Sequence, residues 1–93
     1  MDPNQCAVVE RIDAETVSNV ASLLEQSTTM VQLVLREAEL DALWSLADVA
    51  ASSGDAQAEA ARDQLWMIHE ELGHGERAAA LSGLRSLEGW LAT

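Results

Sequence analysis

The residues best suited to chemistry are two histidines in the segment His69-Glu-Glu-Leu-Gly-His74. A helical zinc site places its two histidines at positions i and i+4, on one face of the helix. Here the spacing is i and i+5, which separates the side chains by about 140° on a helix. The spacing therefore argues against a helical zinc site. A looser metal site that combines His69, His74 and either Glu70 or Glu76 stays open as an alternative.

The sequence shows no convincing arrangement of residues for other kinds of catalysis. Cys6 is the single cysteine, and neither histidine has an evident serine or cysteine partner for nucleophilic catalysis. Glu70 and Glu71 are adjacent, so on a helix their carboxylates diverge by about 100°. Gly73 and Gly75 belong to no phosphate-binding loop motif. We therefore expect a protein that is not an enzyme and that has no cofactor, no catalytic residues and no metal.

The charge balance narrows the class of partner. Sixteen Asp and Glu residues stand against five basic residues, all arginine, which gives a formal net charge of −11. Direct binding to nucleic acid or to an anionic membrane is therefore unfavourable, because both require basic patches. A protein partner with a basic patch fits better, although the charge could also serve solubility alone.

Composition also suggests where the protein works. A lone cysteine gives no sign of an oxidising compartment. We find no signal-peptide pattern and no apolar run near the roughly twenty residues that span a bilayer. We expect a cytoplasmic protein, and the alanine-rich, lysine-free composition suggests a bacterial or phage origin.

The fold class follows from helix-forming residues and helical periodicity. Apolar residues make up 48% of the chain, with much alanine and leucine. Apolar positions keep one helical phase over more than thirty residues. They are Val17, Val20, Ala21, Leu24, Val31, Leu35, Ala38, Ala42, Leu46 and Val49. We predict an all-α antiparallel bundle in which one long helix, from about residue 13 to 52, precedes two shorter helices near 56–72 and 76–91.

Such a first helix would be about 60 Å long, whereas a compact domain of this size is about 30 Å across. We therefore expect a homodimer that buries the surplus apolar surface. The predicted dimer interface consists of Val17, Val20, Leu24, Val31 and Leu35. Helix propensity falls at Ser27–Thr29, so a break there stays open, although the uninterrupted phase favours continuity. Residues 1–12 are expected to be a flexible arm, and residues 13–93 a single helical domain.

The candidate partner-binding site is an acidic helix face with a tryptophan in its middle. On the predicted helix 56–72, Glu59, Asp63 and Glu70 lie roughly opposite the apolar stripe, and Trp66 projects among them. Arg62 shares this face and could pair with Glu59. Exposed tryptophans are frequent anchors of protein interfaces. The alternative is that Trp66 is ordinary core, covered by another element or by the second chain.

Together these observations predict a non-catalytic, acidic helical dimer that binds another protein as a regulator or adaptor. One alternative is an inhibitor, for example one encoded by a phage, that mimics nucleic acid with its carboxylates. The arginines interspersed among the carboxylates speak against it. A metal-dependent protein that uses His69 and His74, and a purely structural assembly subunit, also stay open.

Overall fold

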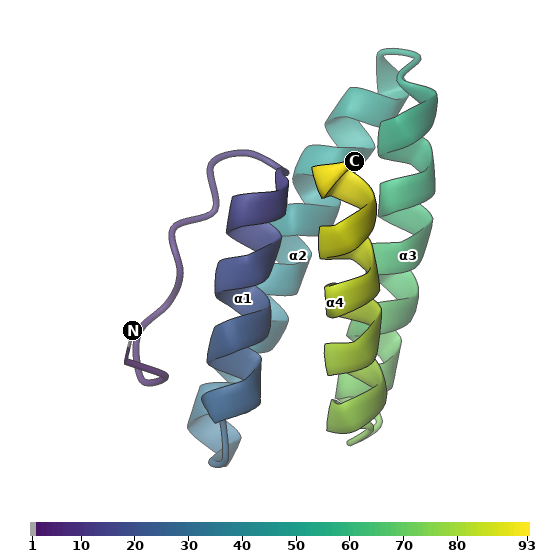
Figure 1. Ribbon diagram of the computed structural model, residues 1–93. Helices are drawn as coiled ribbons and strands as arrows, with labels where there is room; N and C mark the ends of the chain where they lie inside the picture. Colours follow the sequence, from purple (N-terminus) through teal and green to yellow (C-terminus); the bar gives the residue numbers. More distant parts are fainter. Residues whose placement is uncertain (1) are drawn as a thin grey trace.

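A computed structural model describes residues 2–93, and Met1 of the expected arm lies outside the described residues. The described residues form four helices and no strand. The helices are α1 (Ala14–Gln26), α2 (Met30–Ser52), α3 (Ala56–Gly73) and α4 (Arg77–Ala92). They run alternately down and up as an antiparallel bundle (Figure 1). The predicted all-α class is confirmed.

The expected continuous helix over residues 13–52 is wrong, and the described chain has four helices where three were expected. Ser27 caps the C-terminal end of α1, and its hydroxyl donates to the Leu23 carbonyl at 2.6 Å. The second begins with a capping box, in which Thr29 Oγ1 accepts from the Gln32 amide and Gln32 Oε1 accepts from the Thr29 amide. Each cap satisfies backbone groups that a helix end would otherwise leave unpaired.

The break escapes the periodicity because α2 has apolar residues on its outer side as well as on its core side. At 100° per residue, the outer residues Val31 and Val49, which are exposed, continue the phase of the buried positions of α1. The core side of α2, with Leu40 and Leu43, is turned about 100° away from that phase, and the chain reverses direction at residues 27–29. As a result the molecule measures 38 × 24 × 21 Å, too short for a helix of about 60 Å.

The remaining helix boundaries follow ordinary capping chemistry. Asp13 begins α1 by accepting the Thr16 amide at 2.8 Å, and Asp55 begins α3 in the same manner. Gly54 lies in the turn between α2 and α3, and Gly75 lies in the turn between α3 and α4. Their φ angles are 94° and 79°, a left-handed conformation that glycine adopts most easily. Helices α3 and α4 agree with the predicted ranges to within one residue at each end.

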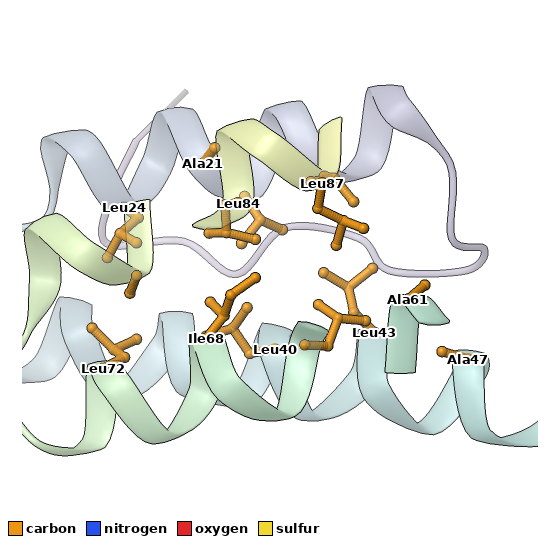
Figure 2. Packing of buried hydrophobic residues seen from close by; sticks show 14 residues of the cluster. Ala21, Leu24, Leu40, Leu43, Ala47, Ala61, Ile68, Leu72, Leu84 and Leu87 are labelled. Atoms are coloured by element: carbon orange, nitrogen blue, oxygen red, sulfur yellow. The ribbon is translucent and has the colours of Figure 1, made fainter. Parts of the chain in front are cut away.

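The core lies between two helix pairs. Helix α2 packs mainly on α3, α1 packs mainly on α4, and α3 packs on α4, whereas α1 and α2 touch only sparsely. Figure 2 shows leucine, isoleucine and alanine side chains of all the helices meeting in this interior. Burial of these side chains is the main source of stability. The largest of them are Leu24, Leu40, Leu43, Leu65, Leu84 and Leu87, all without solvent exposure.

The reversal at Ser27 divides the long apolar stripe into two halves with different environments. The α1 half is fully buried, since Val17, Val20 and Leu24 have no exposed area. In this fold they offer no surface to a second chain, because α1 folds back onto α4. Within the predicted dimer interface, only Val31, which is exposed, and Leu35, which is half-buried, lie on the outside of the molecule.

A buried ion pair holds the segment before α1 against the bundle. The side chains of Arg36 and Glu39 are completely buried, with Arg36 Nε 2.5 Å from Glu39 Oε1. Arg36 also donates to the backbone carbonyls of Pro3 at 3.0 Å and Gln5 at 2.5 Å. The Ala7 amide donates to Glu39. Residues 2–12, expected to be an arm, thus have no helix but make specific contacts with α2.

The last helix contains two glycines, and one of them explains a close approach. A Cβ atom at Gly83 would lie 2.7 Å from Cγ1 of Ile68, whereas one at Gly89 would meet nothing within 4 Å. The missing side chain of Gly83 thus lets α4 approach Ile68 of α3 closely. None of the described helices combines the length and the apolar character needed to cross a membrane.

Candidate functional site

The most distinctive surface feature is a pair of tryptophans on neighbouring helices. Trp66 of α3 is 54% exposed, and Met67 beside it is 62% exposed. Trp44 of α2 is half-buried, and its ring centroid lies 6.3 Å from that of Trp66, with the planes tilted by 54°. This is a favourable aromatic contact. It fixes the orientation of Trp66 while leaving more than half of the side chain in solvent.

The tryptophan pair forms part of an open hollow. Its lining residues are Trp44, Arg62, Asp63, Trp66 and Met67, around a volume of about 520 Å³. Most of the lining surface is apolar, because the two indole rings and the Met67 thioether contribute more of it than Arg62 and Asp63 do. We call this surface the tryptophan hollow. It is large enough to accept an apolar side chain of another molecule.

Helical geometry explains why Trp66 lies outside the hydrophobic core. On α3 the buried positions are Ala58, Ala61, Leu65, Ile68 and Leu72, which repeat at spacings of three and four. Trp66 follows Leu65 directly, so it is turned about 100° away from the core face. The alternative that Trp66 is ordinary core therefore does not hold for this chain alone.

The acidic residues predicted to surround Trp66 are all exposed. Glu59, Asp63 and Glu70 lie on the same side of α3, within about 60° of the direction of Trp66. Among residues 2–93, no basic side chain forms an ion pair with Glu59 or Glu70. Their charges therefore face solvent near the tryptophan hollow.

Arg62 pairs with Asp48 and Asp63 instead of Glu59, the partner that the sequence allowed. Its Nη1 lies 3.1 Å from Asp48 Oδ1 of α2, and its Nε lies 3.8 Å from Asp63 Oδ1. The reason is that Arg62 faces the α2–α3 seam, where Asp48 offers a partner on the adjacent helix. Arg62 thus ties the two helices together at one border of the hollow.

The two histidines lie in different surroundings. His69 Nε2 is 3.2 Å from Asp41 Oδ1 across the α2–α3 seam. His74 caps the C-terminal end of α3 and is exposed, with its backbone amide donating to the carbonyls of the last turn. Within the part of the chain that the structure describes, no three His, Cys, Asp or Glu side chains gather in a way that could hold a metal ion.

Cys6 lies on the surface of the N-terminal segment. Partial burial raises the pKa of its thiol above the ordinary value, and the nearby Glu39 carboxylate adds to this shift. A raised pKa lowers the thiolate fraction at neutral pH, so this thiol is less nucleophilic than a free cysteine.

The pairing of Trp44 with Trp66 was not anticipated from the sequence, although a signal for it exists. The turn between α2 and α3 is centred near Gly54. Trp44 precedes it by ten residues and Trp66 follows it by twelve, so an antiparallel hairpin brings them to nearly the same level. The contribution of Met67 to the hollow could not be read in this way.

Comparisons with known proteins found no match: no protein-family model fits the chain, and no curated protein or solved structure is significantly similar to it. The interpretation of the site therefore depends on its own geometry.

Proposed function

We propose that this protein is a non-catalytic regulator or adaptor that binds a protein partner at the tryptophan hollow. The observation that carries the proposal is the exposure of Trp66 and Met67, at 54% and 62%, beside a second tryptophan. Tryptophan is among the residue types that contribute most to binding energy at protein interfaces. Leaving such apolar surface in water is unfavourable, and a partner that covers it gains the hydrophobic free energy.

The hollow has the composition of an interface centre with a polar border. Trp66 is held in place by Trp44, so it loses little conformational entropy on binding. Met67 adds a flexible thioether that adapts to the shape of a bound side chain. The surrounding Glu59, Asp63 and Glu70 are exposed and would favour a partner with lysine or arginine next to its apolar anchor.

The experiment is a selection of random displayed peptides on the immobilised protein. The bound peptides are then compared on wild type and Trp66→Ala without counter-selection, so that their dependence on the hollow is measured and not imposed. We expect the selected sequences to share one large apolar residue with Lys or Arg within a turn of it. Their affinity should fall moderately as salt is raised, because the carboxylates contribute attraction that ions screen.

A matched control variant is Val8→Ala, which shortens another exposed apolar residue, in the N-terminal segment. It should bind the selected peptides as the wild type does. Peptides that bind wild type and Trp66→Ala equally would contradict the proposal. If those peptides were purely basic and their binding collapsed steeply with salt, the nucleic-acid-mimicking alternative would replace it.

A further inference from the structure

The outer face of α2 carries a second apolar surface, separate from the tryptophan hollow. Val31 and Val49 are each 68% exposed, and Val34 is 54% exposed. At 100° per residue they belong to a stripe about 120° wide and about 27 Å long. The stripe comprises Val31, Val34, Ala38, Ala42, Leu46 and Val49, with Leu35 and Ser45 between them. We call it the outer α2 stripe.

No charged side chain falls within the stripe, in a chain whose net charge is −11. The core side of α2 points elsewhere, since Leu40, Leu43 and Ala47 are fully buried against the bundle. The described helices therefore pack mainly on the other side of α2. Within the outer α2 stripe, Val31, Val34, Ala38 and Val49 are exposed, and Leu35, Ala42 and Leu46 are half-buried. This is the part of the long apolar pattern that the reversal at Ser27 leaves unburied.

The order of side chains along the stripe is nearly symmetric about Leu40. Three of the four pairs of positions equally far from Leu40 match in character, and the fourth pairs Leu35 with Ser45. The matching pairs are Val31 with Val49, Val34 with Leu46, and Ala38 with Ala42. In an antiparallel isologous dimer centred at the level of Leu40, residues equally far from Leu40 meet across the two-fold axis, so apolar side chains of similar size pack on one another. This arrangement favours a second copy of the chain as the occupant.

We infer that the outer α2 stripe binds a second copy of this chain, with the two α2 helices antiparallel and the two-fold axis near Leu40. Ala38 and Ala42 then lie at the centre, where small side chains let the helix axes approach closely. Val31 of one chain packs on Val49 of the other at each end. The inference is independent of the tryptophan hollow, whose lining comes mostly from α3 and which the dimer would display twice.

The charges beside the stripe give this dimer a characteristic salt dependence. Glu37, Asp41 and Asp48 follow one edge of it. A two-fold axis across antiparallel helices brings this edge close to the same edge of the other copy. Like charges then repel, although Arg62 and His69 lie near Asp48 and Asp41. Added salt screens the repulsion and should strengthen the dimer, whereas it should weaken the binding of a basic partner.

The first test is analytical ultracentrifugation over a range of concentrations, with wild type, Ala38→Glu and Ala60→Glu. Both alanines are exposed, on α2 and α3 respectively, so each variant adds the same charge at a tolerant surface site. We expect a wild-type dimer that tightens with salt, and a dissociation constant raised about 30-fold or more by Ala38→Glu. Ala60→Glu should dimerise like the wild type.

The second test fixes the orientation by cross-linking in a Cys6→Ser background. A mixture of Val31→Cys and Val49→Cys should form a disulfide between the two variants, whereas Val31→Cys alone should not. Cross-linking of Val31→Cys with itself would show a parallel pair and overturn the orientation. A wild type that stays monomeric at all concentrations, or equal dimerisation of Ala38→Glu, would overturn the inference itself.

Discussion

The buried Arg36–Glu39 pair gives the sharpest prediction about stability. In Glu39→Gln the side chain keeps its shape but loses its charge, so the Arg36 guanidinium stays buried without a counter-ion. Both side chains have no exposed area, and breaking such a pair typically costs about 3–5 kcal/mol. Arg36 retains the Pro3 and Gln5 carbonyls as acceptors, which favours a loss near the lower limit, about 3 kcal/mol.

That loss is large for a chain of 93 residues, whose total stability is roughly 5–14 kcal/mol by size. Equilibrium urea unfolding, followed by far-ultraviolet circular dichroism, measures it directly. The control is Glu37→Gln on the same helix, which removes an identical charge outside the buried pair and should change stability by less than about 0.5 kcal/mol.

The double variant Arg36→Met/Glu39→Leu tests whether the loss of stability in Glu39→Gln comes from the unpaired charge of Arg36. It removes both charges, so no uncompensated ion remains, and it should be more stable than Glu39→Gln. A Glu39→Gln protein that loses less than about 1 kcal/mol would refute the reasoning. It would mean that water reaches the pair in solution and that residues 2–12 do not cover it.

Three further outcomes test the packing and the caps. Gly83→Ala should destabilise the protein by about 1–2 kcal/mol despite the gain in helix propensity, since the new Cβ would lie 2.7 Å from buried Ile68. Gly89→Ala has open space around the new Cβ and should stabilise the protein by up to about 1 kcal/mol. Thermal unfolding of the two variants tests this difference in sign. Hydrogen bonds from Thr16 lower the pKa of Asp13, so the cap stabilises the protein above the usual aspartate pKa and the benefit is lost as pH falls through the lowered value. Asp13→Ala should therefore cost about 1 kcal/mol at neutral pH and progressively less in acid, and a constant difference across the titration would contradict this. Arg77→Met should destabilise by about 1–3 kcal/mol, since its guanidinium donates to three carbonyls at the end of α1, and unchanged urea unfolding would argue against that contact.

Sequence reasoning succeeded where one helix presents one apolar face. Helix α3 carries Ala61, Leu65 and Ile68 at spacings of three and four, and its cap at Asp55 and the turn glycine at Gly54 mark the boundary. Such local signals determine helix limits because the caps and turns satisfy backbone groups within a few residues. The same geometry places Trp66 away from the core face of α3, but the sequence left open whether another element covers it.

Reasoning from periodicity failed at Ser27–Thr29 because exposed apolar residues of α2, among them Val31 and Val49, continue the phase of the buried positions of α1, so the stripe itself gives no sign of the reversal. The Thr29-x-x-Gln32 capping box was readable in the sequence and would have corrected it. The partners of Arg36 and Arg62 were not readable, because they depend on which helices become neighbours. Such tertiary contacts arise from packing, not from the local spacing that a single sequence displays.

The central claim, that the tryptophan hollow binds a protein partner, is tested most directly by calorimetric titration of one selected peptide into wild type and Trp66→Ala. If Trp66 is the anchor, its removal should weaken binding by about 30-fold or more while the circular dichroism spectrum stays unchanged. Equal affinities for the two proteins, within about twofold, would contradict the account.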